Sequence, residues 1–305
     1  RIIIRGERSI SNSNAPLLIL DGVPSTIGID AINTDDVESI NVLKGPSASA
    51  LYGSAAANGV IIVTTKKGKL GETKVEVNSL TSFDVPYLYP HFQNTYGQGN
   101  TGMYNPNEEY SSWGPKMEGQ TVTNFLGEEV KLNPQPNNIK DFFRTGLTLS
   151  NGFSYSTGNQ KSTAYLSYTN TKYQGLLPVN ESLSHKINLR VNSELMKNLS
   201  MDFVVNWIGG GYGKNYPSTG DDLWSPMWQL VKMPRSIRTQ DISDASYYDA
   251  NLSLKQLTWA PNSTAVINPY WSINGRETNS SSSNLNAVAS LKYNITSWLY
   301  VQLRG

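Results

Sequence analysis

The feature that most constrains this fold is a series of alternating segments joined by connections of alternating length. Within His185–Leu195, Ile187, Leu189 and Val191 alternate with polar residues, and Leu199–Trp207 and Leu285–Tyr293 show a similar alternation. Weaker versions are Lys74–Phe83, Phe143–Tyr155, Thr163–Tyr173 and Trp298–Arg304. A period of two predicts β-strands with one apolar and one polar face, at about the 9–11 residues that a tilted membrane strand needs.

The connections between these segments favour a membrane barrel. They run over residues 84–141, 156–161, 174–184, 196–198, 209–284 and 294–297, so long and short ones alternate. In an up-and-down meander this places all long loops at one end, as in outer-membrane barrels, whereas a secreted β-sandwich predicts similar loops at both ends. Roughly seven strands do not close a bacterial barrel, so we expect a piece of a longer protein.

Residues 1–68 predict a separate, small α+β unit. Its expected strands are Arg1–Arg5, Pro16–Leu20, Ile40–Leu43 and Gly59–Lys66. The last of these contains the β-branched run Val60–Thr65, which is typical of a strand buried on both faces. Asp35 and Glu38 have the spacing of a helix N-cap and its reciprocal partner. Pro46 is suited to open a short helix and Gly53 to end it. We therefore expect one domain over 1–68 and another over 69–305.

Composition excludes several classes of function. Charged residues make up 16% of the chain, against roughly 25% in an average soluble protein. The net charge of +1 argues against nucleic-acid binding, which needs a basic surface. The chain has no cysteine, so disulfides and thiol chemistry are absent from it.

Catalysis and metal binding find little support in the sequence. His91 and His185 lie far apart, without the spacing of metal ligands or of a nucleophile and its base. Acidic pairs could suggest glycoside hydrolysis, but adjacent acids do not establish two carboxylates across a bond. These pairs are Glu108–Glu109, Glu128–Glu129 and Asp221–Asp222. We expect no enzyme activity, no cofactor and no metal.

Aromatic residues in the long connections are the better candidates for substrate or partner contacts. They are Tyr104, Trp113, Trp224, Trp228, Trp259, Tyr270 and Trp271. Flat rings with a polar group suit stacking on sugars or peptide side chains. The alternative is that they hold the loops together or join an aromatic girdle, as we expect of Trp207 and Trp298. A loop helix is predicted over Asp221–Lys232, with an apolar face for packing.

Several motifs resemble one transporter family. The stretches Glu38–Pro46, Leu51–Gly53 and Ala57–Lys66 resemble the end of a TonB-dependent transporter plug, with motif residues Gly45, Pro46, Tyr52, Gly53, Asn58 and Gly59. Matches to the SusC/RagA branch are Leu18–Pro24, Ser112–Lys116 with Gly119, Phe142–Gly146, Met233–Ile237 and Asn268–Trp271. The chain carries no match to a TonB box or to the first half of a plug.

The resemblance implies a membrane β-barrel of about 22 antiparallel strands with an α+β plug in its lumen. It implies TonB-dependent import of oligosaccharides or peptides across the outer membrane of a Gram-negative, Bacteroidota-like bacterium. The implied partners are a SusD-like surface lipoprotein, the TonB–ExbB–ExbD complex and outer-membrane lipid, and the family allows a dimer of transporter–lipoprotein pairs. The alternative is a secreted or surface β-rich glycan-binding protein without transport activity.

Overall fold

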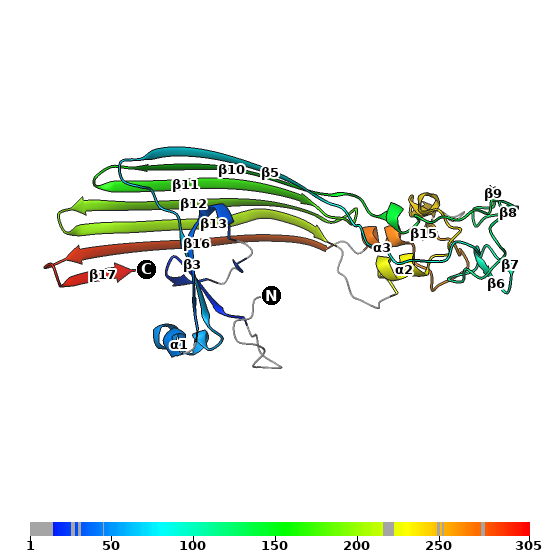
Figure 1. The fold of residues 1–305 in the computed structure, drawn as a ribbon, viewed down its shortest axis with the longest axis horizontal. Helices are drawn as coiled ribbons and strands as arrows, with labels where there is room; N and C mark the ends of the chain where they lie inside the picture. Colours follow the sequence, from blue (N-terminus) through cyan, green and yellow to red (C-terminus); the bar gives the residue numbers. More distant parts are fainter. Residues whose placement is uncertain are drawn as a thin grey trace.

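The computed structural model describes residues 15–25, 28–29, 32–44, 46–215, 223–248, 251, 253–275 and 278–305. Three parts are visible in Figure 1: an N-terminal sheet, a long curved sheet that we call the wall, and a loop unit beyond one end of the wall. The strand expected at Arg1–Arg5, the motif residue Gly45 and the acidic pair Asp221–Asp222 lie outside the described residues.

The N-terminal sheet has four strands in the order β2-β1-β4-β3. They are β1 (Leu17–Leu20), β2 (Val23–Pro24), β3 (Val37–Leu43) and β4 (Val60–Thr65). Strand β4 is central, parallel to β1 and antiparallel to β3. Its alternate residues enter two separate apolar clusters, Ile61 and Val63 in one and Val60 in the other, which confirms the prediction of burial on both faces.

Short helical elements connect these strands. Helix α1 (Pro46–Tyr52) ends before Gly53, whose φ of 66° lies in the left-handed region that favours glycine, and the 3-10 helix η3 (Gly53–Ala56) follows. The expected cap at Asp35 is wrong. Asn33 caps the 3-10 helix η2 (Thr34–Asp36) by accepting from the Asp35 amide at 3.3 Å, and Glu38 already belongs to β3.

The wall is a seven-stranded antiparallel meander in the order β17-β16-β13-β12-β11-β10-β5. Its strands are β5 (Thr73–Asp84), β10 (Gly146–Gly158), β11 (Ser162–Gln174), β12 (Glu181–Met196), β13 (Leu199–Asn215), β16 (Thr278–Asn294) and β17 (Tyr300–Arg304). All the predicted wall segments are strands. The first six are 12–17 residues long, beyond the expected length, because pairing continues into the long connections.

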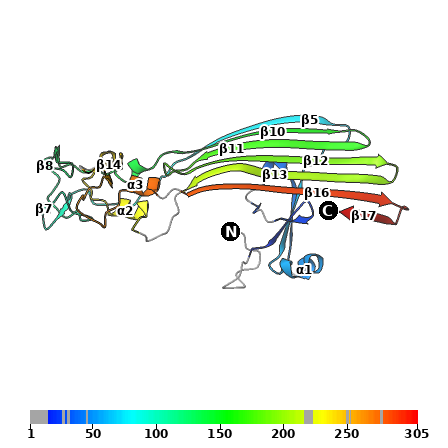
Figure 2. The same cartoon turned by 180° about the vertical axis from the view of Figure 1, so that it is seen from behind.

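Register gives the wall an apolar face and a polar face. One row of directly paired residues crosses five strands as Val77, Phe153, Tyr168, Ile187 and Trp207. Side chains of the opposite parity, such as Tyr165 and Asn206, point towards the N-terminal sheet and bond to it. The N-terminal sheet therefore lies on the polar side of the wall, with α1 at its far end, as the views from both sides show (Figures 1 and 2).

The loop unit combines residues 85–145 with the described part of 216–277. It contains α2 (Pro226–Lys232), α3 (Pro269–Gly275), the 3-10 helices η4 (Lys140–Phe142) and η5 (Thr239–Ile242), and the strand pairs β6 (Gly99–Asn100) with β7 (Met103–Tyr104), β8 (Thr121–Thr123) with β9 (Glu129–Lys131), and β14 (Ser246–Tyr248) with β15 (Leu254–Gln256). Helix α2 is shorter than predicted, because the Ser225 side chain caps it by accepting from the Trp228 amide.

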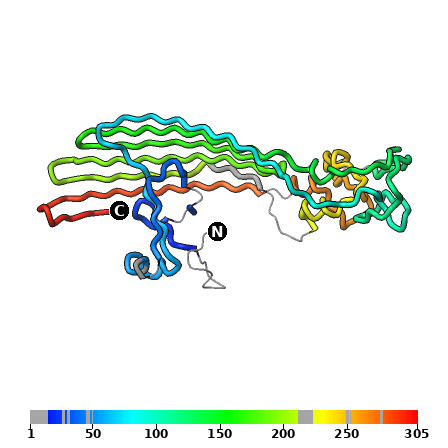
Figure 3. The backbone as a smooth tube through the Cα atoms, viewed as in Figure 1, coloured from blue at the N-terminus to red at the C-terminus, as the bar shows by residue number. Residues whose placement is uncertain are grey.

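Both long connections contribute to a single core in the loop unit. Phe142 from the first packs with Leu230, Ile242 and Trp259 from the second, all fully buried or nearly so. The tube in Figure 3 shows the two connections interleaved at the end of the wall. None of the helices in the described ranges has the length and apolar character needed to cross a membrane.

Candidate functional site

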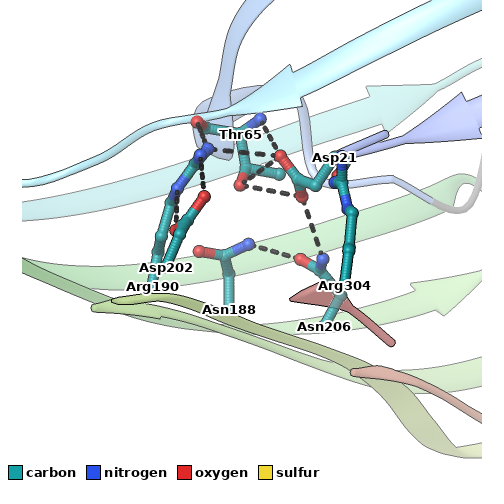
Figure 4. Close-up of polar contacts among 7 residues, drawn as sticks. All are labelled: Asp21, Thr65, Asn188, Arg190, Asp202, Asn206 and Arg304. Atoms are coloured by element: carbon teal, nitrogen blue, oxygen red, sulfur yellow. Dashed lines mark hydrogen bonds and ion pairs between the residues drawn. The ribbon is translucent and has the colours of Figure 1, made fainter. Parts of the chain in front are cut away.

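The N-terminal sheet meets the wall at the end of β1, where Asp21 lies (Figure 4). Asp21 adopts a left-handed φ of 50° in a tight Asp-Gly turn, and its side chain is 1% exposed. The carboxylate accepts from the Thr65 amide at 2.8 Å and from the Thr65 hydroxyl at 3.0 Å. The turn after β1 is thereby fastened to the end of β4.

Arg190 reaches this carboxylate from wall strand β12. Its Nη1 lies 3.4 Å from Asp21 Oδ1 and donates to the Thr65 carbonyl at 3.1 Å. Its other edge forms two bonds to Asp202 on β13, Nε to Oδ1 at 3.3 Å and Nη2 to Oδ2 at 3.0 Å. The planar guanidinium donates along two edges at once, so one side chain joins the N-terminal sheet to two wall strands.

Amide side chains and a second arginine complete the site. Asn206 Nδ2 donates to Asp21 Oδ2 at 3.2 Å, and Asn188 Nδ2 donates to Asn206 Oδ1. Arg304 on β17 donates from Nη2 to the Asp21 carbonyl. Glycine is favoured at Gly22, because its φ of 84° lies in a backbone region that other residues rarely adopt.

A second polar contact lies beyond the same end of β4, where the Lys66 amide donates to the Asp36 carbonyl at 2.7 Å. Asp36 is buried and accepts from the Tyr165 hydroxyl of β11 at 2.8 Å. Asn33 bridges the parts through Nδ2, which lies 3.0 Å from Asp36 Oδ2 and 2.9 Å from Thr169 Oγ1. These hydrogen bonds, too, join the N-terminal unit to side chains on the polar face of the wall.

We call these two contacts, around Asp21 and around Asp36, the joint. Their chemistry suits a joint that opens. The apolar clusters of the described residues each lie within the N-terminal sheet or within the loop unit, so none spans the joint. Hydrogen bonds and ion pairs across it can be replaced by water at modest net cost, except where a buried charge loses its partner. Arg190 has a second partner in Asp202, which stays with the wall.

A cavity of about 610 Å³ lies beside the joint. The connector Lys67–Leu70 and the short-turn ends of β11, β12, β13, β16 and β17 line it. Several buried polar atoms near the joint have no hydrogen-bond partner, among them Ser167 Oγ, Asn188 Oδ1 and Asn192 Nδ2. Nowhere in the described part of the chain do three or more His, Asp or Glu side chains lie close enough to hold a metal ion.

The aromatic candidates of the loop unit occupy different environments. Trp113 is 61% exposed, and its ring centroid lies 5.7 Å from that of Tyr96. Tyr104 lines a second cavity of about 280 Å³, and burial raises the pKa of its hydroxyl. Both belong to the segment around β6 and β7, away from α2 and α3 (Figure 1).

The other candidates belong to the core of the unit or its edge. Trp259 is fully buried and donates from Nε1 to the Glu109 carbonyl at 2.7 Å. Trp228 is covered by the Lys232 ammonium, 4.1 Å from its ring centroid. Tyr270 lies 4.8 Å from the Phe142 ring, and burial raises the pKa of its hydroxyl. Trp224 and Trp271 are half-buried, at the entrance of α2 and within α3.

The plug-motif residues lie away from the joint. Pro46, Tyr52 and Gly53 belong to α1 and its end, and Asn58 and Gly59 lead into β4. The residues of the joint were not among the site predictions. Their alternation pattern could have indicated them, because Asn188, Arg190, Asp202 and Asn206 all fall on the polar face of neighbouring strands.

Comparisons with known proteins agree with this architecture. Residues 1–60 match the TonB-dependent Receptor Plug Domain. The chain is 45% identical over 92 residues to the TonB-dependent receptor SusC of Bacteroides thetaiotaomicron, covering 27% of this chain and 9% of that protein. It is 30% identical over 206 residues to the TonB-dependent receptor P39 of Formosa agariphila, covering 67% of this chain and 18% of that one.

Solved structures give the same fold. The RagAB peptide transporter matches with a TM-score of 0.69 at 20% identity, over 99% of this chain and 35% of that one. The RagAB peptide importer in its closed-closed state matches with a TM-score of 0.65. The chain thus spans less than a fifth of these curated relatives and about a third of the RagAB chain. The chain belongs to the SusC/RagA-like TonB-dependent transporters of the bacterial outer membrane.

Proposed function

We propose that the complete protein imports oligosaccharides or peptides across the outer membrane by TonB-dependent active transport. Residues 1–68 would be the C-terminal part of the plug, and residues 69–305 the first strands of a barrel of about 22. Substrate would lie between the plug and the extracellular loops 84–141, 174–184 and 209–284, beneath a SusD-like lipoprotein. TonB–ExbB–ExbD would supply the energy. We propose no catalytic role.

The observation that carries this proposal is the polar joint between the N-terminal sheet and the wall. A part that must move under force needs contacts that can be exchanged for water, and Asp21, Thr65 and Arg190 provide them. A purely structural core between the two sheets would be apolar. Polar residues along the wall also leave a hydrated route once the N-terminal sheet moves.

A reversible tether across the joint tests the proposal. Asn33 and Thr169, whose side chains bond at 2.9 Å, are changed to cysteine and linked by a short, cleavable thiol crosslinker. The control pair is Ser162→Cys with Ser193→Cys, whose hydroxyls lie 2.7 Å apart within the wall. A deletion strain carrying each form is first screened on a panel of oligosaccharides and peptides, and uptake of the supporting nutrient is then measured.

We expect the joint tether to abolish uptake and its cleavage to restore uptake, while the wall tether leaves uptake unchanged. Full uptake with the joint linked would contradict movement of the N-terminal sheet. If no nutrient in the panel depends on the protein and a glycan still binds to cells, the protein is a surface glycan-binding protein without transport.

A further inference from the structure

The outward, apolar face of the wall carries basic and aromatic side chains at one height on three neighbouring strands. They are Lys172 on β11, His185 on β12 and Trp207 on β13, all of the same parity as Ile187 and Tyr168. Barrel strands tilt by about 35–45°, so residues at equal height are offset from direct pairing by about two positions per strand. Lys172 pairs directly with Leu183, and His185 lies two positions from Leu183 on β12. His185 in turn pairs with Gly209, and Trp207 lies two positions from Gly209 on β13. The offset therefore brings Lys172, His185 and Trp207 to the same height.

The His185 ring is held in one orientation. The Tyr168 hydroxyl lies 2.8 Å from His185 Nδ1, and Asn170 Nδ2 lies 3.3 Å from the same atom. The Tyr168 ring stacks on the imidazole with centroids 6.0 Å apart and planes at 20°. Gly210, at φ 67°, makes room, since a Cβ there would lie 2.7 Å from His185 Cδ2. In the tautomer that accepts from Asn170 Nδ2 at Nδ1, the imidazole carries its proton on Nε2, which is then the ring's donor.

Lys172 supplies a cation next to this ring. It is exposed, and within the described ranges no carboxylate forms an ion pair with it. The neighbouring Glu181 is instead 3.6 Å from Arg144. Below Lys172 the outward side chain of β11 is Asn170, and beyond it Tyr168 and Leu166 of β11 and Ile187 of β12 form an apolar surface.

We propose that Lys172 and His185 bind the phosphate of a lipid headgroup in the outer leaflet. Phosphate oxygens would accept from the Lys172 ammonium and from His185 Nε2, while the acyl chains lie along Leu166, Tyr168 and Ile187. The aromatic ring of Trp207 marks the height of Lys172 and His185 as the membrane–water interface, where such headgroups lie. The inference requires that this face contact the bilayer, and it does not depend on what the protein transports.

The test measures lipid binding to the complete transporter in detergent, with and without Lys172→Ala/His185→Ala. The probes are a phosphorylated outer-membrane glycolipid, the same glycolipid after dephosphorylation, phosphatidylglycerol and inorganic phosphate. Native mass spectrometry gives the fraction bound, and heat-modifiable migration verifies that each variant is folded. Lys197→Ala is the matched control, since Lys197 lies in the short turn between β12 and β13 at the opposite end.

We expect the double variant to bind the phosphorylated glycolipid about tenfold more weakly, and Lys197→Ala to bind as the unchanged protein does. Dephosphorylation should produce a similar loss, and added salt should weaken binding. Equal binding of phosphatidylglycerol extends the site to any lipid phosphate. Equal binding by the double variant, or of the dephosphorylated lipid, overturns the proposal, as does competition by inorganic phosphate at micromolar concentration.

Discussion

Among the residues of the joint, Asp21 bears the largest desolvation, with a side chain 1% exposed. Burying a carboxylate is tolerable when hydrogen bonds and a counter-charge replace its water. Thr65 donates twice, Asn206 once, and Arg190 supplies the charge. Because Arg190 is also paired with Asp202, opening the joint strips a partner mainly from Asp21, which then reaches water as it leaves.

Arg190→Met should loosen the joint strongly. Removing one partner of a buried ion pair costs about 3–5 kcal/mol, and Asp21 would remain buried without a counter-charge. The measurement is the labelling rate of a single cysteine at Thr169, which is 6% exposed beneath the N-terminal sheet. We expect labelling to accelerate on the order of 100- to 1,000-fold.

Asp202→Asn is the control for that change. It leaves Arg190 and Asp21 together, and the Asp202 side chain is 36% exposed, so water screens its charge. Labelling at Thr169 should change less than about fivefold. If Arg190→Met labels no faster than Asp202→Asn, the Arg190–Asp21 pair does not hold the joint.

Arg235 should dominate the stability of the loop unit. It is 5% exposed, and its Nη2 donates to neutral acceptors only, Asn94 Oδ1 at 3.3 Å and the carbonyls of Gln135 and Pro136 at 3.2 Å. Burial lowers its pKa, yet the group stays charged at any physiological pH. It ties the second long connection to the first.

Arg235→Ala should therefore open the unit to proteolysis, since several carbonyls and amides lose a buried donor at about 1–3 kcal/mol each. Arg235→Lys should rescue little, because an ammonium lacks the planar fork. Arg238→Ala is the matched control: its side chain is 53% exposed, and its pair with Asp241 is a surface ion pair. Equal protease resistance of the Arg235 and Arg238 variants would refute this role.

At the scale of elements, the strands of the wall were predictable because a period of two survives in a single sequence. Leu166, Leu189 and Val205 belong to apolar series with a period of two and form one row in the structure. The extra strand length was not predictable, because pairing beyond the membrane is maintained by backbone bonds and needs no apolar side chains. The cap at Asn33 was missed because Asp35 and Glu38 fit the same spacing.

The outward face of β11 gives a prediction about depth in the membrane. Leu166 is 40% exposed in the middle of the apolar face, and Leu166→Arg should destabilise the folded transporter in lipid by about 2–4 kcal/mol. Ser162→Arg, at the turn end of the same strand and face, should cost about 0–1 kcal/mol. Urea unfolding in vesicles measures both. Equal effects would show that this face does not contact lipid.

At the scale of the whole molecule, the division into an N-terminal unit and a meander followed from the change of pattern after Gly68. The joint could not be predicted from the sequence, because the partners of Asp21 lie 44 to 283 residues away from it. No local pattern pairs Asp21 with these residues, which are Thr65, Arg190, Asn206 and Arg304. The folded loop unit was missed for the same reason. Trp259 and Phe142 come from different connections, and only the assembled sheet brings those connections together.

The edges of the wall give the last prediction. Strands β5 and β17 each have a single neighbour among the described strands, so both present unpaired backbone groups. An open edge in hydrocarbon leaves several N–H and C=O groups without partners, each costing several kcal/mol. Residues 1–305 produced alone should therefore fail to insert: we expect them to be extracted from membranes by urea and to migrate identically with and without heating. The complete transporter should resist extraction and be heat-modifiable. Insertion of the isolated chain as a monomer would mean that β5 and β17 satisfy their edges by pairing with each other.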